Sequence, residues 1–317
     1  MAGAITHLLI AEGALEHNDI PPQLSNILRN AKPFLLLGSV SPDLPYASKQ
    51  GRWADRMHYL KTNLVPIQCA ISVGCGNLME GATREQQMAW VAGYISHCVA
   101  DATIHPIVQK ITGPYHADPD VHRQCEMIQD SLLFSEIKRA NLQGSHFIKQ
   151  LKECGSERNI RGILDNWVNS LRLVYGQHAK PAPQPEKWLI FYFTLVKAAS
   201  DAELLNKITR VSRPLNNWVY PVAEDIERKR HEEASHYYYS ASLPLNGNRR
   251  GSFREYGYQR AIDNLIPIWN DLWEDIQNAR NIGPELERSR LKQSLLNWDL
   301  DTGADMDMPD MRVTYWR

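Results

Sequence analysis

The stretch from about residue 84 to residue 109 constrains the fold more than any other part of the sequence. Its apolar residues recur at helical spacing and it carries almost no charge, which predicts one long buried helix. The residues that indicate this are Trp90, Val91, Gly93, Tyr94, Ile95, Cys98, Ala100, Ala102, Ile104 and Val108. His97, Asp101 and His105 follow one another at four-residue intervals and therefore share one narrow face of this helix. A buried carboxylate such as Asp101 needs a charged partner or a metal ion.

The rest of the chain has the same helical character. Asp118 and Pro119 make a good N-cap and first-residue pair for a helix that follows them. Glycine and prolines in GSVSPDLPY (38–46) predict a loop, and PAPQP (181–185) predicts a second break. No run alternates convincingly enough for a sheet, so the expected fold class is all-α. The further helices are expected over 4–16, 22–28, 60–79, 118–141, 159–176, 186–206, 215–237 and 254–280.

The overall composition excludes few partners but favours one compartment. The 35 basic and 36 acidic side chains leave a net charge of −1, and no like-charge block indicates a nucleic-acid arm or a membrane-surface patch. The five cysteines are odd in number and have no CxxC spacing, so we expect them to be reduced. The first residues lack the basic start of a signal peptide, and no run reaches the roughly 18 apolar residues of a membrane span. These observations favour the cytoplasm.

Histidines and carboxylates are concentrated in the first 126 residues. His97 with Asp101 and His122 with Glu126 are each four residues apart, so each pair can converge on one ion from a helix face. Imidazole and carboxylate together form a donor set that zinc accepts, at bond lengths near ~2 Å. The candidate donors are His7, Asp43, His58, His97, Asp101, His105, His122 and Glu126.

Each of these features has a plain structural explanation when it is taken alone. A His-x-x-x-Asp/Glu pair on a helix is more often a solvated ion pair. The sequence has a third such pair, His116 with Asp120, and we place His116 outside the donor set as at most an outer partner. Asp43 could be a turn residue that bonds the local backbone, and His58 could be a surface residue. Trp53 could wall a cleft, although plain packing is the commoner role of such a tryptophan.

Taken together, the order and spacing of the eight donors resemble the bacterial zinc-dependent phospholipase C family. The resemblance covers roughly the first 145 residues, and beyond them only a helical continuation is recognisable. The matching motifs are THLLIA with His7, GSVSPDLPY with Asp43, RMHYL with His58, GYISHCVADATIHP with His97, Asp101 and His105, and HRQCE with His122 and Glu126.

The resemblance implies a site for two or three Zn²⁺ ions in an all-α, multi-helix phospholipase C-like bundle with a helical C-terminal extension. One ion would be bound by Asp43, His58, His97 and Asp101, and a second by His105, His122 and Glu126. A third would be bound by His7, by Asp101 as a bridge and by the amino terminus. Secreted family members expose a processed N-terminal tryptophan there, whereas this chain begins Met-Ala-Gly, so that Ala2 would supply the amine after loss of Met1.

The expected organisation follows from these assignments. Residues 1–150 would form the zinc-binding catalytic helical core, and 151–296 a helical continuation of the same domain or a second lobe. Residues 297–317 would form an irregular C-terminal tail. That tail is acidic and Met-rich, but it carries Trp298, Tyr315 and Trp316 and is therefore expected to dock on the body.

The expected function is hydrolysis of a phosphoric ester by metal-activated water that attacks phosphorus. By resemblance, Asp43 would also orient or deprotonate this water. The expected substrate is a phosphate ester such as a phospholipid. Two alternatives remain open: a single-strand nuclease-like phosphodiesterase and a non-catalytic helical module stabilised by zinc. The balanced charge predicts no stable nucleic-acid complex, and the sequence leaves the oligomeric state open.

Overall fold

A computed structural model describes residues 3–76, 81–142, 160–200, 220–243, 250–282, 289–308 and 314–316. The fold is all-α, as the sequence predicts, and its only strands in these ranges form two antiparallel pairs of two-residue strands. The helices are α1 Ala4–Ala14, α2 Pro22–Asn30, α3 Lys32–Val40, η1 Ser41–Ala47, α4 Gly51–Tyr59, α5 Leu64–Gly74, α6 Arg84–Thr112, α7 Pro119–Lys138, α9 Ile160–Tyr175, α10 Pro185–Ser200, α12 Ala223–Lys229, α13 His231–Ala234, η3 Ser235–Tyr239, η4 Arg254–Gln259, α14 Arg260–Ile282, α15 Arg290–Ser294 and η6 Thr314–Trp316. The paired strands are β1 Ala241–Ser242 with β2 Arg250–Gly251, and β3 Trp298–Asp299 with β4 Ala304–Asp305.

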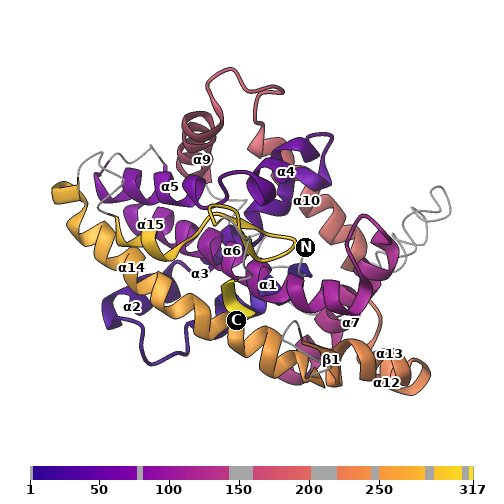
Figure 1. Ribbon diagram of the computed structural model, residues 1–317. Helices are drawn as coiled ribbons and strands as arrows, with labels where there is room; N and C mark the ends of the chain where they lie inside the picture. Colours follow the sequence, from indigo (N-terminus) through magenta and orange to yellow (C-terminus); the bar gives the residue numbers. More distant parts are fainter. Residues whose placement is uncertain are drawn as a thin grey trace.

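Helix α6 is the central element of the fold. It begins with a capping box between Thr83 and Gln86 and ends at Gly113, whose φ of 81° suits a residue without a side chain. Every residue from 87 to 108 is buried, which confirms the prediction of a long buried helix. Helices α1, α3, α5, α7, α9 and α14 all pack against α6, which lies near the middle of Figure 1. Side chains at the middle of α6 are therefore shielded from water on all sides.

Helices α3 and α6 cross with their backbones in direct contact. A Cβ atom on Gly93 would lie 2.0 Å from the Leu35 carbonyl oxygen, and one on Gly38 would lie 2.1 Å from the Trp90 carbonyl oxygen. Glycine is thus required at both positions because no side chain fits between the two helices. The close crossing brings the end of α3 and all of η1 next to the middle of α6.

The segment 38–46 is the main error of the sequence prediction. Residues 38–40 complete α3, and residues 41–47 form the 3₁₀ helix η1 rather than a loop. Gly38 remains helical because it faces α6, and Pro42 lies in the first turn of η1, where its missing N–H is not needed.

Other predicted boundaries also change. The expected helix 60–79 is shorter in its described part: α5 begins at Leu64, after Lys61 with φ of 51° has separated it from α4, and ends at Gly74. The expected helix 215–237 is divided at Arg230 between α12 and α13. Asp118 caps α7 by accepting a hydrogen bond from the Val121 N–H, as predicted. Residues 77–80, 143–159 and 201–219, over which several helices were predicted to extend, lie outside the described residues.

The C-terminal tail is bound to the body in its described part. Trp298 is fully buried, contacts the Tyr315 ring at a tilt of 45° and donates a hydrogen bond from Nε1 to the Thr314 hydroxyl. This agrees with the prediction that the aromatic residues dock the tail. Figure 1 shows the yellow C-terminal segment crossing over α6.

Candidate metal centre

Four side chains from three elements form a first group of donor atoms. Asp43 comes from η1, His58 from α4, and His97 and Asp101 from consecutive turns of α6. His58 Nε2 lies 3.1 Å from Asp43 Oδ1 and 3.6 Å from Asp101 Oδ2. His97 Nε2 lies 3.2 Å from Asp101 Oδ2, 3.2 Å from His58 Nε2 and 3.8 Å from Asp43 Oδ1. The four residues therefore point their donor atoms at one common space.

Backbone carbonyls fix the imidazoles of this group. His58 Nδ1 donates to the Ala54 carbonyl oxygen at 2.7 Å, and His97 Nδ1 donates to the Ser39 carbonyl oxygen at 3.0 Å. Because Nδ1 carries the hydrogen in both rings, a neutral imidazole presents the lone pair of Nε2 to the common space. The Ser39 carbonyl reaches His97 only because α3 and α6 cross so closely.

His105, His122 and Glu126 form a second group. His122 Nε2 lies 3.2 Å from Glu126 Oε1, and His105 Nε2 lies 3.7 Å from the same oxygen. His105 Nδ1 donates a hydrogen bond to the Leu300 carbonyl oxygen of the C-terminal tail. Its Nε2 atom is thereby directed at the group, as in the first group.

Asp101 joins the two groups and His7. Its Oδ2 atom faces the first group, while its Oδ1 atom lies 3.2 Å from His7 Nε2 and 3.6 Å from His105 Nε2. The His7 ring stacks on His97 with 4.1 Å between the ring centroids. A single fully buried carboxylate therefore contacts imidazoles from α1, α4 and α6.

The N-terminal end of α1, which carries His7, is held by Asp130 of α7. The Asp130 carboxylate accepts hydrogen bonds from the Thr6 N–H at 2.8 Å, the Thr6 hydroxyl at 2.6 Å and the Ile5 N–H at 3.2 Å. These N–H groups belong to the first turn of the helix and have no carbonyl partner within it. Asp130 thus sets where His7 lies. The sequence did not reveal this residue, because an aspartate within a helix has no distinctive pattern.

The carboxylates of the centre are held in the ionised form. Burial alone would raise the pKa of Asp101, but the imidazoles of His105 and His97 outweigh it and hold that pKa well below its usual range. Neighbouring imidazoles likewise lower the pKa of Asp43 against burial. The pKa of Glu126 is also held well below its usual range against burial, and hydrogen bonds with His105 and His122 are among the causes.

The pKa values of the two histidines of the second group shift in opposite directions. Burial lowers the pKa of His105, but the carboxylates of Asp101, Glu126 and Asp301 dominate and raise it to about 9. Burial also lowers the pKa of His122, and Glu126 offsets this only in part. Of these two histidines, His105 is therefore the one that holds a proton more firmly when no cation is bound.

The geometry of the centre fits zinc. Tetrahedral zinc with bonds of ~2.0–2.1 Å places its ligand atoms about 3.3 Å apart, and the donor pairs above are separated by 3.1–3.8 Å. The buried Nε2 atoms of His7, His105 and His122 make no hydrogen bond to any described residue. All eight predicted donors belong to buried or half-buried triads that could hold a metal ion: His7, Asp43 and His97; His58, His97 and Asp101; and His105, His122 and Glu126.

Several residues that the sequence left open now have a place. His58 is fully buried rather than at the surface, and Asp43 faces the donor atoms of the first group. His116 is exposed and belongs to none of the triads found among the described residues. Trp53 is fully buried against Trp188, so its role is packing. The chain termini at residues 1, 2 and 317, including the amine proposed as a ligand, lie outside the described residues.

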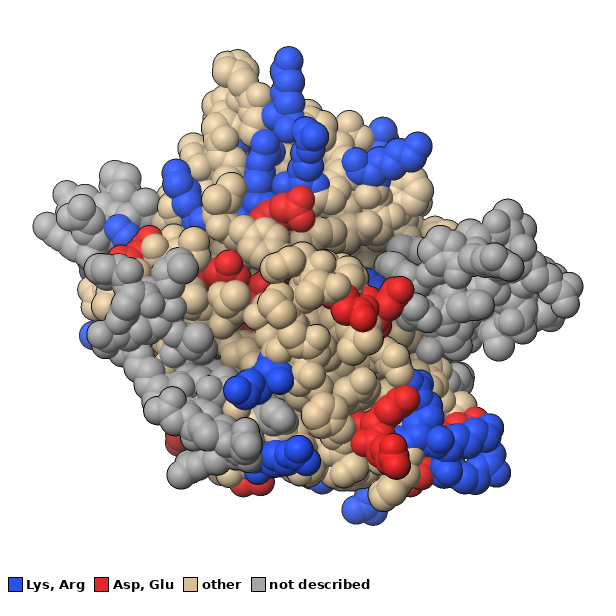
Figure 2. Space-filling model, turned by 45° about the vertical axis from the view of Figure 1, so that its right-hand side comes forward, with Lys and Arg blue, Asp and Glu red and all other residues tan. Residues whose placement is uncertain are grey.

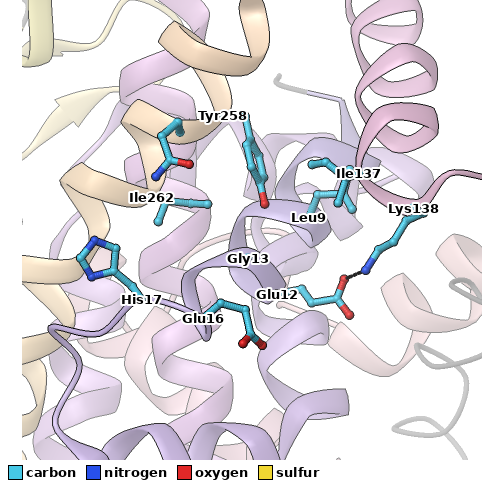
Figure 3. Close-up of a pocket in the computed structure, with 10 residues that line it drawn as sticks. Leu9, Glu12, Gly13, Glu16, His17, Ile137, Lys138, Tyr258 and Ile262 are labelled. Atoms are coloured by element: carbon cyan, nitrogen blue, oxygen red, sulfur yellow. Dashed lines mark hydrogen bonds and ion pairs between the residues drawn. The ribbon is translucent and has the colours of Figure 1, made fainter.

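A separate groove is lined in part by residues 9–17, from α1 to just beyond its end. It has a volume of about 410 Å³ and lies between α1, the end of α7 and the start of α14 (Figure 3). Leu9, Gly13 and Ile262 provide apolar lining, and Glu12 forms ion pairs with Lys138, as drawn, and with Lys32. None of the eight donors lines this groove.

An all-α fold with these triads of histidine and carboxylate defines a helical protein with candidate metal sites. The model of the zinc dependent phospholipase C family matches residues 6–180, which is more than half of the chain. The chain therefore belongs to the zinc dependent phospholipase C family, a family of hydrolases. The match extends past residue 145, where the recognisable motifs end, and includes α9. Neither the curated proteins nor the solved structures include a match to this chain.

Proposed function

We propose that this protein is a phospholipase C-like hydrolase that cleaves a phosphoric ester with the help of zinc. The observation that carries the proposal is the position of Asp101, whose two carboxylate oxygens face different groups of imidazoles in a fully buried centre. A shared carboxylate of this kind can hold two cations close together, as phosphoryl-transfer chemistry requires.

The proposed ligand sets follow the two groups of donors. Asp43, His58, His97 and Asp101 would hold one zinc ion, and His105, His122 and Glu126 would hold another. His7, with Asp101 as a bridge and with the chain's amine, would hold a third. A set of three protein donors leaves one position of a tetrahedral ion open, which is the mark of a catalytic rather than a structural site. This supports an enzyme over a non-catalytic module.

Bound zinc would supply a Lewis acid and lower the pKa of water towards neutrality. Two ions against the three carboxylates would leave one positive charge, which favours an anionic phosphodiester. The side chains of Asp43 and Glu126 are 11% and 9% exposed, whereas the other donors are at most 1% exposed. Asp43 is therefore a donor that water and substrate can reach.

Asp43 is the proposed general base. Its low pKa leaves a carboxylate at neutral pH, ready to accept a proton from the attacking water. The water oxygen would bond to phosphorus, the P–O bond to the leaving alcohol would break, and the alcohol oxygen would take up the proton. This sequence balances without any oxidant or further reactant.

Exposed apolar side chains on or directly after helices that carry or contact parts of the centre support a lipid substrate. Leu60, directly after α4, is 56% exposed, and Ile190 and Phe191 of α10 are 65% and 48% exposed. Helix α10 packs against η1, which carries Asp43, and α4 carries His58. Among the described residues drawn in Figure 2, acidic side chains lie between separate groups of Lys and Arg on the face shown. A nuclease would be expected to present a continuous basic track for its strand.

The test is hydrolysis by purified protein of phosphatidylcholine vesicles, of a water-soluble phosphodiester and of single-stranded DNA. We expect phosphodiester cleavage with release of a phosphorylated head group, and a loss of at least about 100-fold in Asp101→Asn. His116→Ala is the matched control, since His116 is exposed and outside the triads. Cleavage of DNA alone would support the nuclease alternative, and no cleavage by a zinc-loaded protein would refute the proposal.

A further inference from the structure

The C-terminal segment 297–305, here called the strap, lies across the metal centre. It is outside the family match, which ends at residue 180. Leu300 is fully buried and uses its backbone on both sides: its N–H donates to the His58 carbonyl oxygen at 2.9 Å, and its carbonyl oxygen accepts from His105 Nδ1. One residue of the strap therefore joins an imidazole-bearing turn of α4 to an imidazole of α6.

Asp301 repeats this bridge one residue further on. Its Oδ2 atom accepts a hydrogen bond from the Tyr59 hydroxyl at 2.7 Å, and its carbonyl oxygen accepts one from Gln109 Nε2 at 2.7 Å. Tyr59 follows His58, and Gln109 is one helical turn after His105. Asp301 Oδ1 also lies 3.8 Å from His105 Nδ1. The contacts of Leu300 and Asp301 together hold α4 and α6 in fixed positions relative to each other.

The strap can lie directly against α6 because it has a glycine at the point of contact. Gly303 has φ of 67°, and a Cβ atom there would lie 2.4 Å from the Ala102 carbonyl oxygen and 2.9 Å from Pro106 Cγ. Pro106 has no N–H to donate to the Ala102 carbonyl one turn earlier, so α6 leaves this carbonyl open where the strap passes. Ala102 and Pro106 lie directly next to Asp101 and His105.

We propose that the strap is a positioning element of the metal centre, which fixes the tautomer and orientation of His105 and the place of His58. This rests on the proposed function only in so far as these histidines bind zinc. Partners that hold the second nitrogen of a ligating histidine typically contribute about 10–100-fold to metal affinity. The strap would therefore make the C-terminal residues part of the zinc site although they supply no ligand.

The test compares zinc affinity and stoichiometry of the wild-type chain with Asp301→Asn and Gly303→Ala, by titration against a competing chelator. We expect affinity to fall about 10–100-fold in both, and the visible spectrum of the Co²⁺-loaded protein to change. Asp165→Asn is the matched control, because Asp165 is exposed on α9 and pairs with Arg161 of the same helix rather than with the strap. It should bind zinc as the wild type does.

Unfolding of the metal-free proteins separates positioning from mere stability. Asp301→Asn should unfold at nearly the wild-type denaturant concentration and still bind zinc more weakly. If Gly303→Ala fails to fold, the zinc affinity of Asp301→Asn alone tests the proposal. Wild-type zinc affinity in a folded Asp301→Asn protein would overturn the proposal. The protein could also hydrolyse no phosphodiester while its strap variants bind zinc more weakly than the wild type. That result would support the positioning role of the strap and refute only the proposed function.

Discussion

Substitution of Gly93 by alanine connects the helix crossing to the metal centre. The new Cβ atom would lie 2.0 Å from the Leu35 carbonyl oxygen and 2.8 Å from the Ser39 N–H nitrogen, both backbone atoms that cannot rotate away. Helices α3 and α6 would have to separate by about 1 Å or more, since ordinary contacts of this kind exceed about 3 Å. Overpacking of this sort costs about 1–3 kcal/mol, and the backbone clash places Gly93→Ala near the upper value.

The same movement would break the hydrogen bond that orients His97. Its Nδ1 atom lies 3.0 Å from the Ser39 carbonyl oxygen, so a shift of about 1 Å leaves no hydrogen bond. We expect zinc affinity to fall about 10–100-fold. The melting temperature should fall by about 4–5 °C, given an unfolding entropy near ~2.1 cal/mol/K per residue.

Calorimetry and zinc titration of the folded variant measure both effects. Gly176→Ala is the control: unlike the helical Gly93, Gly176 has a positive φ, 96°, and no atom lies within 4 Å of the position that its Cβ atom would take. Its cost should be only the backbone strain of about 1–2 kcal/mol, with unchanged zinc affinity. A stable Gly93→Ala protein that binds zinc normally would show that the close crossing does not position His97.

Three further predictions concern charge. Asp101→Asn should reduce bound zinc to at most one ion per chain, as measured by metal analysis, because the first and the third proposed sites both lose the carboxylate that they share. The pKa of His105 is about 9, so zinc must displace the proton of this imidazole at pH 7. The affinity for zinc should therefore rise about tenfold per pH unit up to pH 9. Calorimetry in buffers of different ionisation enthalpy should detect the released proton. In the metal-free protein the same charge stabilises the fold fully below about pH 6.5, and this contribution is lost as the pH rises through 9. Glu12→Gln should lower the free energy of unfolding by about 1–2 kcal/mol at pH 7, because Lys32 and Lys138 lose their counter-ion. Urea denaturation should show the difference vanish as the pH falls through the depressed pKa of Glu12.

The sequence is most informative where chemistry and helical periodicity coincide. His97, Asp101 and His105 could be placed on one buried face because the apolar pattern of α6 is continuous and the interval of four is fixed by helix geometry. The order of the eight donors along the chain, which the family resemblance made recognisable, predicted that they would lie together. All eight belong to buried or half-buried triads.

Other parts of the centre could not be predicted from residue types. The groups that orient His58, His97 and His105 are backbone carbonyls, and every residue has one, so no sequence pattern distinguishes Ser39 or Leu300. Tertiary packing also decided the local structure of η1 and α3, because Gly38 breaks isolated helices but is required where α6 approaches. The strap depends on contacts between residues about 200 positions apart in the chain, as with His105 and Leu300, separated by 195.

Metal analysis of the purified chain is the decisive measurement for a zinc-dependent hydrolase. We predict two or three zinc ions per chain, bound through imidazole nitrogen and carboxylate oxygen as X-ray absorption would detect, and lost together with phosphodiester cleavage on chelation. His116→Ala should retain them and Asp101→Asn should not. A fully folded protein that binds no zinc when zinc is supplied, or one that cleaves phosphodiesters equally well after complete chelation, would contradict the assignment of the centre to zinc-dependent hydrolysis.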